Sequence, residues 1–180
     1  MKKIIALSLA LVIALMLSLS CAQAEENPLV GQTFPDFSVK TFDGKTFMLS
    51  ESLKTHELVV INFWATWCGP CCYEFPLLEE AWEQYADRVD VIALSVGQSD
   101  TDKVLKAFAK ENGLKFSISR DSKRLYEKTG SIYIPTTVIV DQERNVLSVE
   151  VGMKNSVKQF TDLFDSLLPA PEAEEPAAEL

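Results

Sequence analysis

The chain has 180 residues, of which 47% are hydrophobic and 24% charged, and this composition suits one globular domain with a sizeable core. Its formal net charge is −9, and its basic residues form no cluster interleaved with aromatic ones. Such a surface repels phosphate backbones, so the sequence argues against a nucleic-acid partner.

The first 24 residues have the pattern of an export signal. Two lysines precede an uncharged stretch over 4–19, and residues 22–24 (Ala-Gln-Ala) match the small-x-small pattern of a signal-peptidase site. Two alternatives remain open: an uncleaved anchor, because the stretch is nearly long enough to span a bilayer, and a lipoprotein with Cys21 as its lipidated residue. All three place the folded part outside the cytoplasm, where disulfides persist, with membrane contact only through this segment.

The first predicted element of the folded part is a β-hairpin over 37–48 that turns at an Asp-Gly pair. Residues 58–64 form an apolar run typical of a strand covered on both faces, and therefore of a central strand. The next helix should begin at Pro70, because proline is tolerated in the first helical turn. Pro76 should kink this helix without ending it, because the apolar period continues beyond it.

Strands and helices alternate in the second half. Residues 89–96 predict another buried strand, and a capping box of Ser99 and Asp102 predicts the start of a helix with Val104 among its inward residues. The remaining elements are predicted as a strand over 116–119, a short helix over 123–129, an antiparallel hairpin of strands 136–140 and 146–151, and a helix over 156–168. This order implies an α/β fold with a mixed sheet.

The last segment, residues 169–180, holds three prolines and four glutamates without a basic residue. This composition predicts a disordered acidic tail. The expected organisation is therefore a leader over 1–24, one domain over 28–168 and the tail.

A dithiol motif stands where the central strand becomes a helix, at residues 67–71 (Trp-Cys-Gly-Pro-Cys). A thiol at a helix N-terminus is favoured as the reactive thiolate, because unpaired N–H groups and the helix dipole stabilise negative charge. Cys71 can attack a mixed disulfide formed at Cys68, so the pair can cycle between dithiol and disulfide. A zinc site is the alternative, but zinc normally needs four ligands, and the chain has no second Cys pair and one histidine.

Three features together resemble the thioredoxin superfamily: the motif at 67–71, Pro76 after it, and residues 134–136 (Ile-Pro-Thr) before a late strand. Within the superfamily, residues 62–68 (Asn-Phe-Trp-Ala-Thr-Trp-Cys) and 74–76 (Glu-Phe-Pro) are similar to the TlpA/ResA-like extracytoplasmic thiol-disulfide oxidoreductases, which are related to the redoxin and AhpC/TSA domains.

The resemblance covers roughly residues 30–168. It implies a thioredoxin-like fold, in which helices flank a central mixed sheet. It also implies an N-terminal hairpin, here 37–48, and an extra helix and strand in mid-domain, here 101–119. No cofactor is expected.

The same resemblance implies roles for individual residues. Cys68 would be the exposed nucleophile and Cys71 the more buried resolving thiol. Pro135 would follow a cis peptide bond and leave the preceding backbone free to pair with a substrate strand, whereas an X-Pro bond without this resemblance is expected to be trans. The residues implied to contact substrate are Trp67, Gly69, Pro70, Ile134 and Pro135.

Three further positions carry open alternatives. Glu74 would line the active-site cavity and assist proton movement, or be a solvated helix carboxylate. Asn62 departs from thioredoxins proper, which carry a buried aspartate there; an amide cannot titrate, so that role is absent or passes to Glu74. Cys72 points about 100° away from Cys71 around the helix, which favours a small half-buried hydrophobe over a regulatory or intermolecular thiol.

The sequence thus predicts an enzyme that reduces disulfides in exported proteins, because Gly69, Pro70 and Ile134 match the reducing members of the superfamily. Clients of similar proteins include apocytochrome c, other thiol oxidoreductases and methionine sulfoxide reductases, and a membrane thiol carrier is the usual electron donor. A thiol peroxidase is an alternative, although the Pro-x-x-x-Thr-x-x-Cys setting of such enzymes is missing. A binding module or chaperone with an incidental dithiol is another.

Overall fold

The structure, a computed structural model, describes residues 27–169. Its elements are β1 (Ser38–Lys40), β2 (Thr46–Met48), α2 (Leu49–Ser52), β3 (Leu58–Trp64), α3 (Gly69–Glu83), β4 (Val89–Ser95), α4 (Asp102–Glu111), β5 (Ser117–Arg120), the 3₁₀ helix η1 (Tyr126–Thr129), β6 (Thr136–Val140), β7 (Val146–Val151) and α5 (Val157–Leu167). The expected leader and all but the first residue of the expected tail lie outside the described residues.

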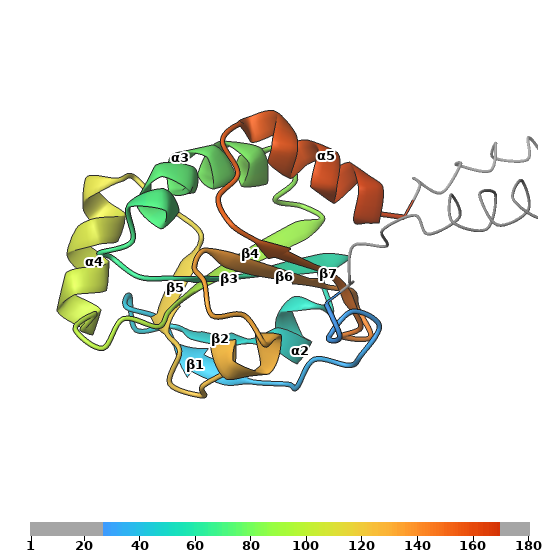
Figure 1. Ribbon diagram of the computed structural model, residues 1–180, viewed down its shortest axis with the longest axis horizontal. Coiled ribbons are helices and arrows are strands. Elements are labelled where there is room, and N and C mark those ends of the chain that lie inside the picture. Colours follow the sequence, from blue (N-terminus) through green and yellow to red (C-terminus); the bar gives the residue numbers. More distant parts are fainter. Residues whose placement is uncertain (1–26, 170–180) are drawn as a thin grey trace, which may run out of the picture.

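Five strands form one sheet in the order β5-β4-β3-β6-β7, and β1 and β2 form a separate antiparallel hairpin (Figure 1). β3 pairs in parallel with β4 and antiparallel with β6, so the sheet is mixed and β3 is central. All seven residues of β3 are buried, because helices cover one face and the hairpin covers the other. These findings confirm the predicted thioredoxin-like architecture, including the terminal hairpin of β6 and β7.

Two apolar layers hold the sheet between them. Figure 1 shows α3 and α5 side by side over one face, where Trp64 packs against Phe75 and Phe108 with ring centroids 4.5 and 4.8 Å apart. On the opposite face, Phe37 and Phe47 of the hairpin region stack at 5.9 Å. Burial of these aromatic side chains, together with the aliphatic residues of the strands, stabilises the core on both faces of the sheet.

Helix α3 begins at Gly69, one residue before the expected start, and Cys68 is its N-cap. The backbone N–H of Cys72 donates to the Cys68 carbonyl at 3.0 Å, which places the dithiol in the first turn. Pro76 lies inside the helix, which continues to Glu83 as the sequence predicts.

The predicted start of α4 is wrong. Its N-cap is Thr101, whose hydroxyl accepts the N–H of Val104 at 3.4 Å, so Ser99 and Asp102 form no capping box there. The helix starts later because the residue before Thr101, Asp100, is fully buried and turned toward the sheet. Val104 is 39% exposed and therefore does not face inward.

The helix predicted over 123–129 is only the short η1, which is closed by Gly130 with φ 67°. The reason is a turn built by Asp121, whose carboxylate accepts the N–H groups of Leu125 and Tyr126, both at 2.8 Å.

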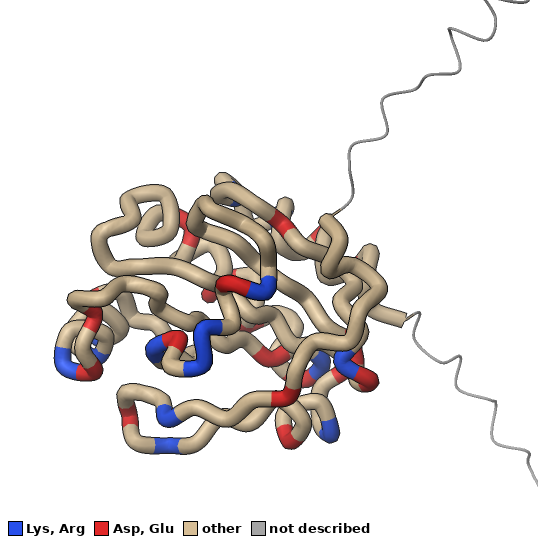
Figure 2. The backbone as a smooth tube through the Cα atoms, turned by 60° about the horizontal axis from the view of Figure 1, so that its bottom comes forward, with Lys and Arg blue, Asp and Glu red and all other residues tan. Residues whose placement is uncertain are grey.

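Charged residues are distributed over the outside of the domain. Acidic and basic positions are interspersed along the backbone rather than gathered in one basic surface (Figure 2). Among the described residues, no helix has both the length and the apolarity needed to cross a membrane.

Candidate active site

The dithiol is oxidised: Cys68 and Cys71 form a disulfide with an S–S distance of 2.07 Å. The backbone N–H of Cys71 points at the Cys68 sulfur, with an N to Sγ distance of 3.2 Å. This N–H is one of the unpaired donors of the first turn of α3, so it can stabilise negative charge on Cys68 once the disulfide is opened.

The expectation that Cys68 is exposed is wrong, because only 5% of it is accessible. Its Sγ lies 3.8 Å from the carbonyl oxygen of Ile134, so the segment before β6 covers it. Cys71 is completely buried, so Cys68 is still the more accessible sulfur. Beside the pair, Trp67 is 67% exposed and stands at the rim of the site.

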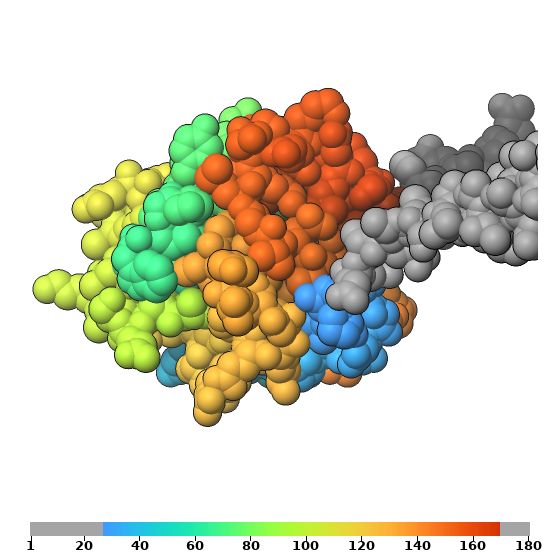
Figure 3. Space-filling model, viewed as in Figure 1, coloured from blue at the N-terminus to red at the C-terminus, as the bar shows by residue number. Residues whose placement is uncertain are grey.

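The segment before β6 forms the opposite wall of the site. The Ile134–Pro135 peptide bond is cis, as expected, with Pro135 buried and Ile134 half-buried. Figure 3 shows the beginning of α3 (green) beside this segment (orange) on one face of the molecule. The preceding residues, Ile132 and Tyr133, are large and exposed. Apolar side chains therefore border the disulfide on this side.

Two of the expected substrate-contact residues, Gly69 and Pro70, are exposed at the start of α3. No heavy atom lies within 4 Å of the position that a Cβ on Gly69 would take. The surface of the first turn of α3 is therefore uncrowded at Gly69, between the two cysteines.

Glu74 is almost fully buried, with 1% of it accessible, so the alternative of a solvated carboxylate is wrong. One of its oxygens accepts a hydrogen bond from the Asn62 amide at 2.9 Å, and the other accepts the backbone N–H of Lys154 at 3.1 Å. Burial raises the pKa of Glu74 above its ordinary value, although both hydrogen bonds oppose the shift. A carboxyl group with a raised pKa, one helical turn beyond Cys71, can accept and return a proton.

Asn62 connects Glu74 to the sheet. It is fully buried, and its amide N–H groups also donate to the hydroxyl of Thr137 at 2.9 Å. No sequence motif includes Thr137 or Lys154 as a site residue, and they are 75 and 80 positions away from the partners they contact. No local pattern signals such contacts, because they depend on the pairing of β3 with β6 and on where the chain turns after β7.

Cys72 is half-buried and takes no part in the disulfide. Its Sγ lies 3.5 Å from the Thr66 carbonyl oxygen and can donate a hydrogen bond to it. Burial raises the pKa of the Cys72 thiol, and the negative charge of Asp100 raises it further. This thiol therefore stays protonated more readily than an ordinary cysteine.

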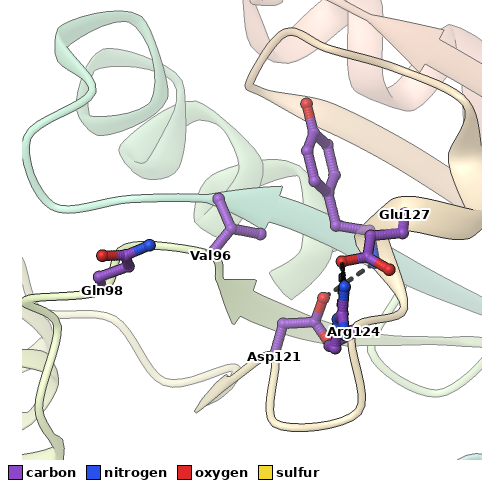
Figure 4. Close-up of a pocket in the computed structure, with 6 residues that line it drawn as sticks. Val96, Gln98, Asp121, Arg124 and Glu127 are labelled. Carbon is purple, nitrogen blue, oxygen red and sulfur yellow. Dashed lines mark hydrogen bonds and ion pairs between the residues drawn. The ribbon is translucent and has the colours of Figure 1, made fainter.

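A polar hollow lies beside the loop that follows β4 (Figure 4). Its lining residues are Val96, Gln98, Asp121, Arg124, Tyr126 and Glu127. Arg124 is paired with Glu127 at 2.5 Å, and both oxygens of Asp121 accept backbone N–H groups. Neither cysteine of the disulfide lines it. Within residues 27–169, no three His, Cys, Asp or Glu side chains are grouped to hold a metal ion.

Comparison with known proteins agrees with this geometry. The model of the AhpC/TSA family matches residues 30–149. The thioredoxin-like protein YneN of Bacillus subtilis (strain 168) is 35% identical over 136 residues, which are 74% of this chain and 79% of that protein. The thiol-disulfide oxidoreductase ResA of Bacillus thuringiensis subsp. konkukian is 31% identical over 147 residues, which are 81% of this chain and 82% of that protein.

Among solved structures, a thiol:disulfide interchange protein of the thioredoxin family from Chlorobium tepidum superposes with a TM-score of 0.62. It is 30% identical in sequence, and the match covers 74% of this chain and 94% of that one. The chain therefore belongs to the AhpC/TSA family and is a thioredoxin-like thiol-disulfide oxidoreductase.

Proposed function

We propose that this oxidoreductase reduces disulfides in proteins outside the cytoplasm, by exchange through Cys68 and Cys71. The observation that carries the proposal is their disulfide at the start of α3, with the Cys71 N–H directed at the Cys68 sulfur. The reducing direction is supported by the Gly-Pro pair between the cysteines, and the compartment by the export pattern of residues 1–24.

The first step starts from the reduced dithiol. The Cys68 thiolate attacks one sulfur of a client disulfide, and a bond forms between that sulfur and Cys68 Sγ. The client S–S bond breaks, and its other sulfur leaves as a thiolate that takes up a proton. The helix N-terminus assists because its N–H groups stabilise the attacking thiolate.

The second step releases the client. Cys71 loses its proton, and its thiolate attacks Cys68 Sγ, so that the Cys68–Cys71 bond forms and the mixed disulfide breaks. The client leaves with two thiols, and two electrons have passed to it. Glu74 is the proton acceptor for Cys71, since it lies one helical turn beyond this cysteine and burial raises its pKa, which makes it a better base than an exposed carboxylate.

Client recognition uses the surface around the disulfide. The exposed Trp67 offers apolar contact on one side, and Ile132 and Tyr133 offer it on the other. The backbone of Ile134, whose carbonyl already faces Cys68, pairs with an extended client segment. Gly69 and Pro70, exposed between the two cysteines, offer further contact to the client.

Regeneration needs a second dithiol, which we assign to a membrane thiol carrier. That dithiol attacks the Cys68–Cys71 disulfide by the same exchange in reverse and is itself oxidised. The two cysteines store both electrons, so the cycle needs no cofactor.

The test is to trap the intermediate. In the Cys71→Ser variant, Cys68 can attack a client but cannot be released, so disulfide-linked adducts should accumulate in the cell envelope and disappear on reduction. Mass spectrometry of the adducts names the clients. Cys72→Ser is the matched control, since it removes the neighbouring thiol of the same helix, and it should give no adducts.

Three outcomes would contradict the proposal. Adducts that persist in a Cys68→Ser, Cys71→Ser double variant would place the reactive sulfur elsewhere. Rapid consumption of hydrogen peroxide that depends on Cys68, without adducts, would favour a thiol peroxidase. Full biological activity of the double variant would favour a binding module or chaperone.

A further inference from the structure

A buried carboxylate, Asp100, contacts the turn that leads into the dithiol. Asp100 is fully buried at the end of the loop between β4 and α4. Its Oδ2 accepts the backbone N–H of Thr66 at 2.9 Å, and its Oδ1 accepts the Thr66 hydroxyl at 2.5 Å. The hydroxyl of Ser95 donates to Oδ2, also at 2.5 Å. A buried carboxylate with three donors is well compensated for the loss of water.

The loop is shaped to bring this carboxylate inward. A Cβ on Gly97 would lie 2.5 Å from Asp100 Oδ2, so only glycine leaves the carboxylate room at this position. The Gly97 N–H in turn donates to the Ser95 hydroxyl at 3.1 Å, which directs that hydroxyl toward Asp100. The backbone N–H of Val96 donates to the Trp64 carbonyl at 2.8 Å and ties the loop to the end of β3.

Thr66 is held at each of its polar groups. Asp100 accepts from its N–H and hydroxyl, and the Cys72 thiol lies 3.5 Å from its carbonyl oxygen. The Cys68 N–H closes the same turn by donating to the Ala65 carbonyl at 3.0 Å. The backbone from the end of β3 to Cys68 is therefore fixed from both sides, by the β4–α4 loop and by α3.

We propose that Asp100 is a positioning residue for the dithiol reaction: it holds Thr66 so that Cys68 keeps its place at the N-terminus of α3, facing Ile134. The proposal rests on the proposed exchange function and deepens it. Asp100 touches no reacting atom and acts through the backbone two residues before Cys68. Precise placement matters because an exchange step needs the attacking sulfur in line with the bond that breaks.

The electrostatics of the network agree with this role. Burial alone would raise the pKa of Asp100, but the hydrogen bonds from Ser95 and Thr66 and the charge of Arg120 hold it below its ordinary value. Asp100 therefore stays a carboxylate, which can accept all three donors at once, whereas an asparagine offers one accepting oxygen.

The test compares rates of attack by Cys68 in the reduced full-length protein. Asp100→Asn should slow the second-order reaction with a reference disulfide by about tenfold, because the turn is no longer held. Thr66→Val should slow it less, since it removes only the hydroxyl, and Thr66→Ser should restore a rate close to that of wild type. The Thr66 pair keeps the proposal testable if Asp100→Asn does not fold.

Glu79→Gln provides the matched control. Glu79 is also a buried carboxylate that accepts a backbone N–H, that of Lys115, at 3.0 Å, but it lies on α3 about two helical turns beyond Cys71 and does not contact the turn before Cys68. Its loss should lower stability without slowing Cys68. Equal slowing in both variants, or a wild-type rate in folded Asp100→Asn, would overturn the positioning role. A wild-type protein that does not react with disulfides would instead contradict the proposed function.

Discussion

Glu74 and Asp100 are both buried carboxyl groups near the dithiol, yet their environments differ. Each has one basic residue nearby, Lys154 for Glu74 and Arg120 for Asp100. Glu74 accepts from two hydrogen-bond donors, one on each oxygen, while Asp100 accepts from three. The pKa of Glu74 is consequently raised by burial, and that of Asp100 is lowered by its partners.

The comparison teaches that burial alone does not decide what a carboxyl group does. Burial favours the neutral form, and each donor favours the charged form, so the balance of the two sets the pKa. For Glu74 the effect of burial is larger than that of the donors, so the group can accept and return a proton. For Asp100 the effect of the partners is larger than that of burial, so the group stays charged and holds the backbone of Thr66 in place.

The largest effect should come from Cys68→Ser. Its residual rate of disulfide reduction is the lowest rate with which the Glu74 and Asp100 variants are compared. Without the nucleophile, disulfide reduction should fall by about a thousandfold or more, since a residue that forms the covalent intermediate cannot be replaced by its surroundings. Turnover of a reference disulfide protein measures it. A smaller loss would mean that another sulfur acts as the nucleophile. It would contradict the role of Glu74 as proton acceptor and that of Asp100 as positioning residue for this dithiol.

Glu74→Gln should have the next largest effect and should act on release rather than attack. The amide keeps the size of the side chain but cannot accept the proton of Cys71, so release of the client should slow by about a hundredfold at neutral pH. Stopped-flow measurement of both steps separates them. A slowed first step with normal release would contradict the proton-acceptor role and would make Glu74 resemble Asp100.

The effects on stability should have the opposite order, with a larger loss for the Asp100 variant than for the Glu74 variant. Asp100→Asn leaves buried donors without acceptors and should lower the free energy of unfolding by about 2 kcal/mol at neutral pH. Glu74→Gln leaves one donor, the Asn62 amide or the Lys154 N–H, without its acceptor, but it also removes a charge that burial disfavours. The two effects oppose each other, so the free energy of unfolding should change by less than about 1 kcal/mol. Urea unfolding of both variants measures the two free energies of unfolding. Equal losses would contradict the different roles assigned to Glu74 and Asp100.

The pH dependence of these stability differences has opposite signs. The pKa of Asp100 is lowered, so its contribution is present above the ordinary value of about 4 and is lost as the pH falls through the lowered value. The pKa of Glu74 is raised, so the folded chain binds the extra proton above about pH 4, and this group's contribution falls as the pH rises through that window. Unfolding midpoints across this range test both slopes; slopes of the same sign would contradict the assignment.

The smallest effect should come from Cys72→Ser. The serine hydroxyl can donate to the Thr66 carbonyl as the thiol does, and Asp100 continues to hold the other polar groups of Thr66. Turnover should therefore stay close to that of wild type. A large loss of activity would show that Cys72 exchanges with the pair and that its thiol is not held apart.

The sequence predicts local features of this molecule well. The predicted bounds of β3, β6 and β7 agree with the structure, and the cis bond before Pro135 follows from the family resemblance. The burial of Glu74 and the inward turn of Asp100 could not be predicted, because each depends on partners from distant parts of the fold. The wrong capping box has the same origin, since a local pattern at Ser99 competes with a long-range contact made by the next residue.

The reduction potential of the Cys68–Cys71 pair against glutathione tests the central claim most directly. A reductant of client disulfides should have a potential near that of thioredoxin, about −270 mV. A potential near −120 mV, roughly that of a strongly oxidising disulfide-forming enzyme, would mean that the pair donates disulfides instead and would contradict the account.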